Sequence, residues 1–377
     1  MRVTVGNGKR EAGNAPTYSP LPYRQLPVLD QRLRGTKFVE LSVRSIVNSP
    51  ESTKMGFWSV NPYVGCEFGC SYCYARYAHR YVVERANDAG RLTSAEFNDL
   101  NAPAGLEPFE HRIFVKSRNS VLAALDRGLA RVRKRALQQG PQTLLIGTGT
   151  DPYQPAERRY RVTRAILERL RLERGLLVGI ITKSPLVCRD IDLLVAVAGK
   201  DELSVYISLT TVDVRFINLF EARSPMPHAR LRALEKLSAS GIRAGLIVAP
   251  VLPGITDSVP QVEAVVKAAA EAGAHFIRPV PLRLYPDVRN RFLPLIERHF
   301  PDLAARYRAR YERAQHAPQS YIRALKRRFK KIAERYGITD CAGSEAKEPP
   351  HRVEREVAQL ELLQTDDSIA SESRHHG

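Results

Sequence analysis

Seven short apolar runs recur through the middle of this chain, and their spacing limits the folds that it can adopt. The runs are Phe57–Val64, His111–Lys116, Thr143–Gly147, Leu176–Thr182, Ser204–Leu209, Arg243–Val251 and His275–Val280. Most of them follow one another at about 30 residues, the length of one strand plus one helix. Runs such as LLVGIIT and GLIVAPV are apolar almost throughout, which is typical of strands buried on both faces of a parallel sheet. The pattern predicts an α/β fold with six or seven parallel strands, and it favours an open or closed TIM-type barrel over a doubly wound sheet.

Amphipathic segments fill the intervals between these runs. They are Ser71–Asn87, Ser120–Gln139, Thr163–Arg174, Arg189–Ala198, His228–Ser240 and Val259–Ala272. Glycines such as Gly140 and Gly241 stand where these segments should end, which is a frequent helix stop. In a barrel of this kind the functional residues follow the carboxyl ends of the strands.

The two ends of the chain differ in character from the middle. Residues 1–50 show no sustained period and predict an extended N-terminal arm, with one short strand at Lys37–Val43. The barrel is expected over residues 51–284. A basic helical extension is expected over residues 285–341, and the polar residues 342–377 predict a disordered tail.

The chain carries a strong excess of positive charge. It has 58 Lys and Arg against 40 Asp and Glu, a net charge of +18. The stretch from Arg283 to Arg335 holds 15 Lys and Arg and five Asp and Glu, with tyrosines interleaved. Such a stretch predicts contact with the phosphates and bases of nucleic acid. The alternative is a helical appendage that packs its tyrosines on the barrel and points its cations to water.

The sequence also predicts where in the cell the protein is found. No apolar run approaches the roughly 18 residues that a membrane span needs, and the first ten residues lack the apolar segment of a secretory signal. We therefore expect a cytoplasmic protein without a membrane partner. Five cysteines in such a chain argue against a disulfide framework and for a metal or catalytic role.

Three of these cysteines form one motif, Cys66-x3-Cys70-x2-Cys73, directly after the first predicted barrel strand. Three thiolates on a four-iron cluster leave one iron open, and an open iron can bind a reactant. Two alternatives remain at this point. One is a zinc site with His79 as the fourth ligand, and the other is a chance grouping in a buried turn.

The motif, with an aromatic residue before its last cysteine and a barrel after it, resembles the radical S-adenosylmethionine (SAM) superfamily. More narrowly, it resembles the spore photoproduct lyase-like branch, also called DNA repair photolyase-like. The resemblance spans about Trp58 to Pro281 and rests on Cys70-Ser-Tyr-Cys73-Tyr, Thr150-Asp151, Ile181-Thr-Lys183, Tyr206-Ile-Ser208, Glu221-Ala-Arg-Ser-Pro225 and Gly245-Leu-Ile-Val-Ala-Pro250.

The resemblance implies a partial (β/α) TIM-type barrel with a [4Fe–4S] cluster on Cys66, Cys70 and Cys73, and with SAM at the open iron. An electron from a donor such as flavodoxin or ferredoxin would cleave SAM and release a 5′-deoxyadenosyl radical, which abstracts a hydrogen from the substrate.

The resemblance also implies roles for four residues around SAM. Tyr72 matches the aromatic whose backbone meets the adenine, and Thr150, Lys183 and Ser208 match SAM-binding positions. Three of the four have a plainer alternative from the sequence alone. Lys183 could be a rim lysine, Thr150 part of a helix-capping turn, and Ser208 an ordinary strand end.

Two further positions concern the fate of the radical. Tyr74 matches a tyrosine proposed to relay hydrogen in the lyase. The cysteine that returns hydrogen in the lyase is replaced here by Thr148, whose O–H bond is too strong for that role. Cys188 is expected to be an apolar core residue. The resemblance therefore extends to radical generation and not to the lyase reaction itself.

Three functions follow from these patterns. The first is a radical SAM enzyme that acts on nucleic acid and recruits it through the basic C-terminal region. The second is the same radical chemistry on a protein or small molecule. The third, from a different class, is a zinc-stabilised nucleic-acid-binding protein without catalysis.

Overall fold

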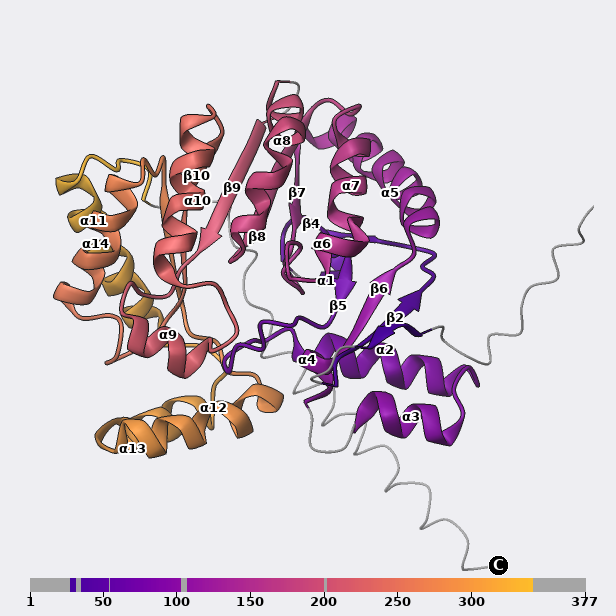
Figure 1. Cartoon of the computed structure of the whole chain (residues 1–377). Helices are drawn as coiled ribbons and strands as arrows, with labels where there is room; N and C mark the ends of the chain where they lie inside the picture. The colour runs from indigo at the N-terminus through magenta and orange to yellow at the C-terminus, as the bar shows by residue number, and fades with distance from the viewer. Residues whose placement is uncertain (1–27, 32–34, 54, 103–106, 200–201, 342–377) are drawn as a thin grey trace, which may run out of the picture.

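One large sheet dominates the part of the chain that the structure describes, which is residues 28–31, 35–53, 55–102, 107–199 and 202–341 (Figure 1). In this computed structural model its strands follow the order β11-β10-β9-β8-β7-β4-β3. They are β3 (Val47–Asn48), β4 (Trp58–Val60), β7 (Gln142–Ile146), β8 (Leu176–Thr182), β9 (Glu202–Ser208), β10 (Arg243–Val251) and β11 (Ile277–Pro281). All neighbours from β4 to β11 are parallel, and β3 runs antiparallel to β4. These six parallel strands confirm the predicted partial barrel.

Several helices cover the outer face of the large sheet, and others lie beside the small sheet or beyond the ends of the strands (Figure 1). They are α1 (Pro50–Thr53), α2 (Arg76–Asp88), α3 (Ser94–Asn101), α4 (Pro108–His111), α5 (Arg118–Gln139), α6 (Glu157–Tyr160), α7 (Val162–Leu170), the 3-10 helix η1 (Pro185–Asp190), α8 (Ile191–Ala198), α9 (Val214–Phe220), α10 (Pro227–Ala239), α11 (Val259–Glu271), α12 (Pro286–His299), α13 (Pro301–Tyr311) and α14 (Gln319–Arg335). Parallel neighbours need such crossovers, because a tight turn cannot join two strands that point the same way.

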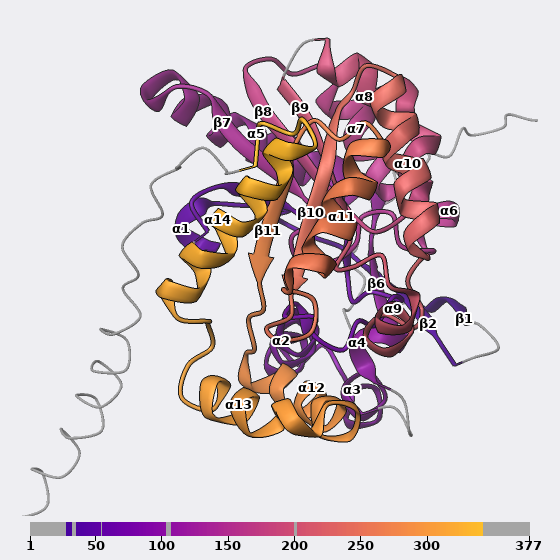
Figure 2. The ribbon, with the colours of Figure 1, turned by 90° about the vertical axis from the view of Figure 1, so that its left-hand side faces the viewer.

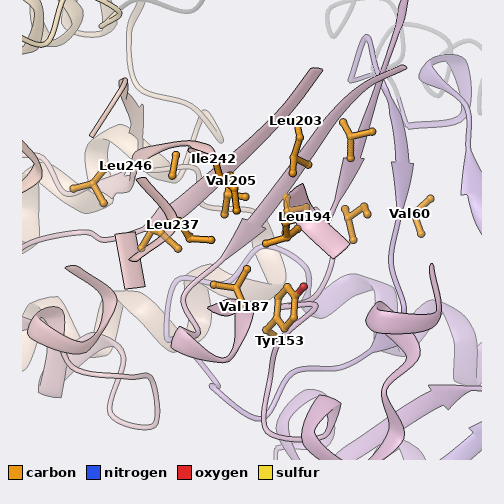
Figure 3. Packing of buried hydrophobic residues seen from close by; sticks show 14 of the residues in the cluster. Val60, Tyr153, Val187, Leu194, Leu203, Val205, Leu237, Ile242 and Leu246 are labelled. Carbon is orange, nitrogen blue, oxygen red and sulfur yellow. The ribbon is translucent and has the colours of Figure 1, made fainter. Parts of the chain in front are cut away.

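The main core lies between the sheet and these outer helices. Figure 3 shows Leu203 and Val205 of β9 near Leu194 of α8 and Leu237 of α10, and all four belong to one cluster of buried side chains. Burial of each such side chain contributes about 1.5–3 kcal/mol to the stability of the fold. The apolar runs form strands here because both of their faces are covered.

The second predicted run of the barrel is in a different sheet, and this part of the prediction is wrong. The run contains β6 (Arg112–Lys116), which lies in a four-stranded sheet with the order β1-β2-β6-β5. Its companions are β1 (Val28–Gln31), β2 (Lys37–Leu41) and β5 (Tyr63–Val64). The first predicted run therefore divides between β4 of the large sheet and β5 of the small one. Periodicity reports burial, and it does not report which strand a segment pairs with.

The residues before the barrel are partly built into these sheets. β2 matches the short strand predicted in this region and pairs in parallel with β6. Residues 1–27 and the predicted tail at 342–377 lie outside the described residues. In the described part of the chain, no helix has the length and apolar character that a membrane crossing requires.

The helices after the barrel occupy two places. Figure 2 shows α12 and α13 beyond the carboxyl ends of β10 and β11, whereas α14 lies along the flank beside β11. Leu325, Phe329 and Ile332 of α14 join the main core, and the amide of Ile277 donates to the carbonyl of Asp340 at 3.1 Å. α14 and the residues after it thus cover the outer edge of β11.

Candidate active site

The three cysteines of the motif lie on one loop at the carboxyl end of the barrel strands. Cys66 and Cys70 are each 7% exposed, and Cys73 is partly exposed. Burial raises the pKa of all three thiols, that of Cys70 to about 11, and the three thiols lie close enough to influence one another. Neighbouring cations act in the opposite direction: Lys183 lowers the pKa of Cys70, and Arg76 lowers that of Cys73.

Short-range contacts fix the path of this loop. The amide of Cys66 donates to the carbonyl of Phe109 at 2.9 Å. The Thr150 hydroxyl donates to the carbonyl of Gly65 at 2.7 Å, and Gln154 Nε2 donates to the same oxygen at 3.1 Å. Thr150, predicted to bind SAM, therefore holds the cysteine loop through its side chain.

Gly65 makes this path possible, because its φ of +86° is one that other residues rarely adopt. A Cβ at Gly65 would stand 2.8 Å from the backbone oxygen of Phe109. We expect Gly65→Ala to lower the free energy of unfolding by about 1–3 kcal/mol and to reduce the iron content after reconstitution. Urea unfolding and iron analysis measure the two effects.

Gly90→Ala is the matched control for this prediction, because Gly90 also has a positive φ, of +64°, but open space around its Cβ position. We expect it to show the backbone strain alone and full iron content. Equal effects of the two substitutions on iron content would contradict the role of Gly65 in shaping the loop.

Lys183 and Ser208 meet at the same end of the barrel as the cysteines. Lys183 Nζ donates to Ser208 Oγ at 2.9 Å and lies 5.7 Å from the centre of the Tyr72 ring. Burial would lower the pKa of Lys183, but Glu221, Cys70 and Asp151 together outweigh it, so the pKa is raised. The structure thus brings together Tyr72, Lys183, Ser208 and the cysteine loop.

A buried ion pair lies beneath this group, and sequence reasoning assigned it no role. Glu221 and Arg230 have no exposed side-chain surface and pair at 2.5 Å. Glu221 also accepts from the Tyr72 hydroxyl and, at 3.0 Å, from Thr210 Oγ1. Arg230 donates to the carbonyl of Ser208 at 2.9 Å. The Glu221 carboxylate thereby links Tyr72 of the cysteine loop to Thr210, which follows β9, and to Arg230 of α10.

Asp151 positions the backbone of Lys183. Its carboxylate accepts from the amide of Lys183 and from the Thr182 hydroxyl, each at 2.7 Å. The residue was visible in the sequence only as the neighbour of Thr150, directly after a strand.

Tyr74 lies on the other side of the loop. Its hydroxyl donates to the backbone carbonyl of Thr148, and its ring lies 6.4 Å from that of Tyr285. Thr148 Oγ1 accepts from the side-chain amide of Asn61 at 3.2 Å. Tyr74 and Thr148 are therefore in contact through the Thr148 backbone.

Three arginines converge on one buried carboxylate behind the cysteine loop. Glu110 accepts from Arg76 at 2.6 Å and from Arg291 at 2.8 Å, and Arg223 also contacts it. Arg76 donates to the carbonyl of Cys70 at 3.1 Å. This cluster joins α2, α4, α12 and the segment after α9 to the loop, and no local motif in the sequence announced it.

His79, the fourth ligand that the zinc alternative names, makes a different contact in the structure. His79 is buried on α2, and its Nε2 lies 2.9 Å from the carbonyl of Arg112. No three His, Cys, Asp or Glu side chains within the described ranges are arranged to hold a single metal ion. A zinc ion would need its sulfurs within about 4 Å of one another, because each Zn–S bond is only about 2.3 Å long. A cluster of four irons spreads its thiolate ligands further apart.

The two cysteines outside the motif lie elsewhere. Cys188 is partly buried, packs against the main core and has its Sγ 3.6 Å from the carbonyl of Ala233. Cys341 is 3% exposed in the same core.

Comparison with known proteins decides the family. Residues 60–262 match the family model described as the radical SAM superfamily. The chain belongs to the radical SAM superfamily. An uncharacterized protein of Mycobacterium tuberculosis (strain ATCC 25618 / H37Rv) is 32% identical over 318 residues, which cover 84% of this chain and 85% of the relative. An uncharacterized protein of Acidianus two-tailed virus is 31% identical over 221 residues, 57% of this chain and 64% of the relative.

Solved structures of spore photoproduct lyase share the fold of this radical SAM protein. A variant of that lyase with dinucleoside spore photoproduct aligns with a TM-score of 0.55 and 14% identity, over 81% of this chain and 80% of the other. A second variant, with bound AdoMet and the same dinucleoside, aligns with a TM-score of 0.51 and 13% identity over 75% of each chain. Membership in the superfamily implies an enzyme that uses SAM and a [4Fe–4S] cluster.

Proposed function

We propose that Cys66, Cys70 and Cys73 bind the [4Fe–4S] cluster and that Lys183, Ser208 and Tyr72 hold SAM beside it. The observation that carries this proposal is the state of Lys183. Its ammonium lies beside the cysteine loop with one hydrogen bond, to Ser208, and no carboxylate of the described residues lies within ion-pair distance of it. A partly buried ammonium in this state is ready to pair with the carboxylate of a ligand.

The cysteine loop fits a cluster of this kind. Thiolates are the protein ligands of iron–sulfur clusters, and all three thiols lie on one glycine-shaped loop, with Cys66 and Cys70 buried and Cys73 partly exposed. Arg76 and Lys183 supply positive charge next to the sulfurs, which offsets the negative charge that thiolates bring into a buried site.

The chain's own residues then have separate tasks. When bound, the cluster and SAM supply one-electron cleavage of a sulfonium bond, which yields the 5′-deoxyadenosyl radical. Lys183 fixes the SAM carboxylate, and Asp151 fixes the backbone of Lys183. Glu221 holds the Tyr72 hydroxyl, so the ring stays beside the Lys183 ammonium. Thr150 supports this arrangement by holding the loop.

Anaerobic reconstitution tests this function directly. The purified chain should take up iron and sulfide and, after reduction with dithionite, should form 5′-deoxyadenosine from SAM. Protein that carries zinc and takes up no iron or sulfide would instead favour the binding-protein alternative. An electron donor such as flavodoxin or ferredoxin is the expected reductant in the cell.

We infer a nucleic-acid substrate from the charge of the chain and from the fold neighbours. The structures of spore photoproduct lyase hold a dinucleoside lesion. α14 presents exposed cations along its outer face, namely Arg323, Lys326, Arg327, Lys330 and Lys331. A protein or small-molecule substrate is the alternative.

The structure also changes which residues should test nucleic-acid binding. Arg328 donates to the backbone carbonyl of Asp257 and so anchors α14, and Tyr307 and Tyr311 are buried. Arg328, Tyr307 and Tyr311 therefore hold the helical extension on the fold, which is the alternative to nucleic-acid contact for residues 283–335. The exposed pair Arg323 and Arg327 is therefore the better choice for testing nucleic-acid binding.

Reversing both charges, Arg323→Glu with Arg327→Glu, is expected to weaken binding of a single-stranded oligonucleotide by at least about tenfold and to flatten its salt dependence. Fluorescence anisotropy at several salt concentrations measures both effects. The control is Arg171→Glu with Arg174→Glu, which makes the same change in net charge near the amino end of β8. If both double variants lost oligonucleotide affinity to a similar degree, net charge alone would explain the effect. That result would contradict α14 as the contact surface.

We also propose that residues 51–284 act as the catalytic barrel and residues 285–341 as the helical extension. The supporting observation is that the last parallel strand ends at Pro281 and the following elements are helices.

A further inference from the structure

A second lysine reaches the carboxyl end of the barrel strands. Lys116 ends β6 of the small sheet, and its Nζ donates to the backbone carbonyl of Asn61 at 2.6 Å. Asn61 directly follows β4, the first parallel strand of the large sheet. The ammonium therefore lies where the two sheets meet, at the functional end of the barrel.

Contacts of Asn61 connect this lysine to the radical side of the site. Asn61 Oδ1 accepts from the amide of Gly149 at 2.7 Å, and its Nδ2 donates to Thr148 Oγ1 at 3.2 Å. The backbone carbonyl of Thr148 accepts from the hydroxyl of Tyr74, the residue after the last motif cysteine. Lys116 is thus connected to Tyr74 through Asn61 and Thr148, whereas Lys183 lies beside the ring of Tyr72.

The ammonium of Lys116 lacks a counter-charge. Its contact is a neutral carbonyl, and no carboxylate of the described residues lies within ion-pair distance. Burial lowers the pKa of Lys116 to about 8, and no neighbouring charge contributes to that shift. Lys37, on the same small sheet, does have a counter-charge, because it pairs with Asp99 at 3.2 Å.

Lys116 is partly buried, and a partly buried charge without a partner is costly, so a fold built only for stability would pair or remove it. Lys183 is the other lysine of this site without an ion pair among the described residues, and the proposed function gives it the carboxylate of SAM. By the same reasoning we expect Lys116 to pair with an anion of a bound ligand.

We propose that Lys116 binds an anionic oxygen of the substrate, and that this group is a phosphate of a nucleic-acid strand. This inference rests on the proposed function for the identity of the substrate. An ammonium is a compact point charge with three donors, so it suits a phosphate whose orientation varies. Asn61 then fixes the ammonium in place, and the strand is held so that one nucleotide faces Thr148 and Tyr74.

Competitive acetylation of the iron-free protein tests this site without any cofactor. A trace of acetic anhydride labels each lysine at a rate set by its access and charge, and mass spectrometry gives the rate for Lys116 relative to exposed Lys236. A single-stranded oligodeoxynucleotide should slow labelling of Lys116 at least fivefold, while Lys236 stays unchanged. Inorganic phosphate at high concentration should protect Lys116 partly.

The outcomes separate the sources of the anion. Protection by inorganic phosphate without protection by the oligonucleotide would overturn the nucleic-acid assignment in favour of a small phosphorylated substrate. Equal labelling with and without either probe would overturn the site altogether. Neither result depends on iron or SAM, so a failure here is distinguishable from a failure of the proposed cluster chemistry.

Two substitutions provide an independent measurement. Lys116→Met should weaken oligonucleotide binding about tenfold, and Lys116→Arg should retain most of it because the positive charge remains. Lys267→Met is the matched control, since Lys267 is exposed on α11 and pairs with Glu271 at 3.8 Å. Unchanged affinity in a folded Lys116→Met protein would also overturn the proposal, and the labelling result on the wild-type chain stands if that variant does not fold.

Discussion

Cys70→Ala is expected to prevent assembly of the cluster and to abolish formation of 5′-deoxyadenosine from SAM. Loss of an outer partner of a metal ligand typically costs about 10–100-fold in affinity or activity, and loss of a ligand itself costs more. We therefore expect SAM cleavage to fall more than about 100-fold. Iron and sulfide analysis, the absorbance of the reconstituted protein and chromatography of the reaction products provide the measurements.

Cys188→Ala is the matched control for this prediction. It makes the same chemical change at a partly buried cysteine that faces the carbonyl of Ala233 and lies outside the loop. It should keep full iron content and SAM cleavage. A Cys70→Ala protein that still loads iron and cleaves SAM at the wild-type rate would refute the proposed ligand set, whatever its stability.

The fold was largely predictable because parallel strands buried on both faces leave a strong mark on the sequence. β8 and β10 are apolar almost throughout, and each coincides with a predicted run. β6 leaves the same mark, yet it pairs with β2 and β5 in the small sheet. Burial is encoded locally, whereas the choice of strand partner depends on the whole chain.

In the candidate site, too, the sequence reveals the residues that are grouped locally and does not reveal the pairs that only the fold brings together. The three cysteines lie within eight residues of sequence, so their grouping was visible before any fold was known. Glu110 and Arg291 are far apart in sequence and meet only after α12 has crossed the end of the barrel. A buried charge looks the same in a sequence as an exposed one. A charged residue at the end of a predicted strand, as Lys116 is, was the one local signal that could have been used.

Thr150 shows a contact that its sequence position did not reveal. Its place after β7 agrees with the predicted strand end, and its hydroxyl donates to the carbonyl of Gly65, while its predicted SAM binding remains a prediction. Sequence matching assigns a position, and the direction of a short side chain follows from its neighbours. Its proposed contribution to SAM binding is therefore through the loop.

Glu221→Ala is expected to lower the free energy of unfolding by about 3–5 kcal/mol, because it leaves the guanidinium of Arg230 buried without its partner. Both side chains are fully buried, and the carboxylate also accepts from Tyr72 and Thr210. Glu84→Ala is the control, since Glu84 pairs with Arg80 at 3.3 Å on the surface and should cost less than about 1 kcal/mol. Guanidinium chloride unfolding at pH 7 compares the two.

The pH dependence of stability gives this prediction a signature that lost packing would not give. Burial alone would raise the pKa of Glu221, but Arg230 and Lys183 outweigh it and lower the pKa from 4.5 to about 2. A carboxyl whose pKa is lower in the folded state stabilises the fold above its unfolded pKa and loses that contribution as the pH falls toward its folded pKa. Glu221→Gln keeps the volume and cannot ionise, so the stability gap between wild type and this variant should narrow from pH 5 to pH 3. A gap that stays constant over that range would show that the charge of Glu221 does not stabilise the fold, and Tyr72 and Lys183 would then need another anchor.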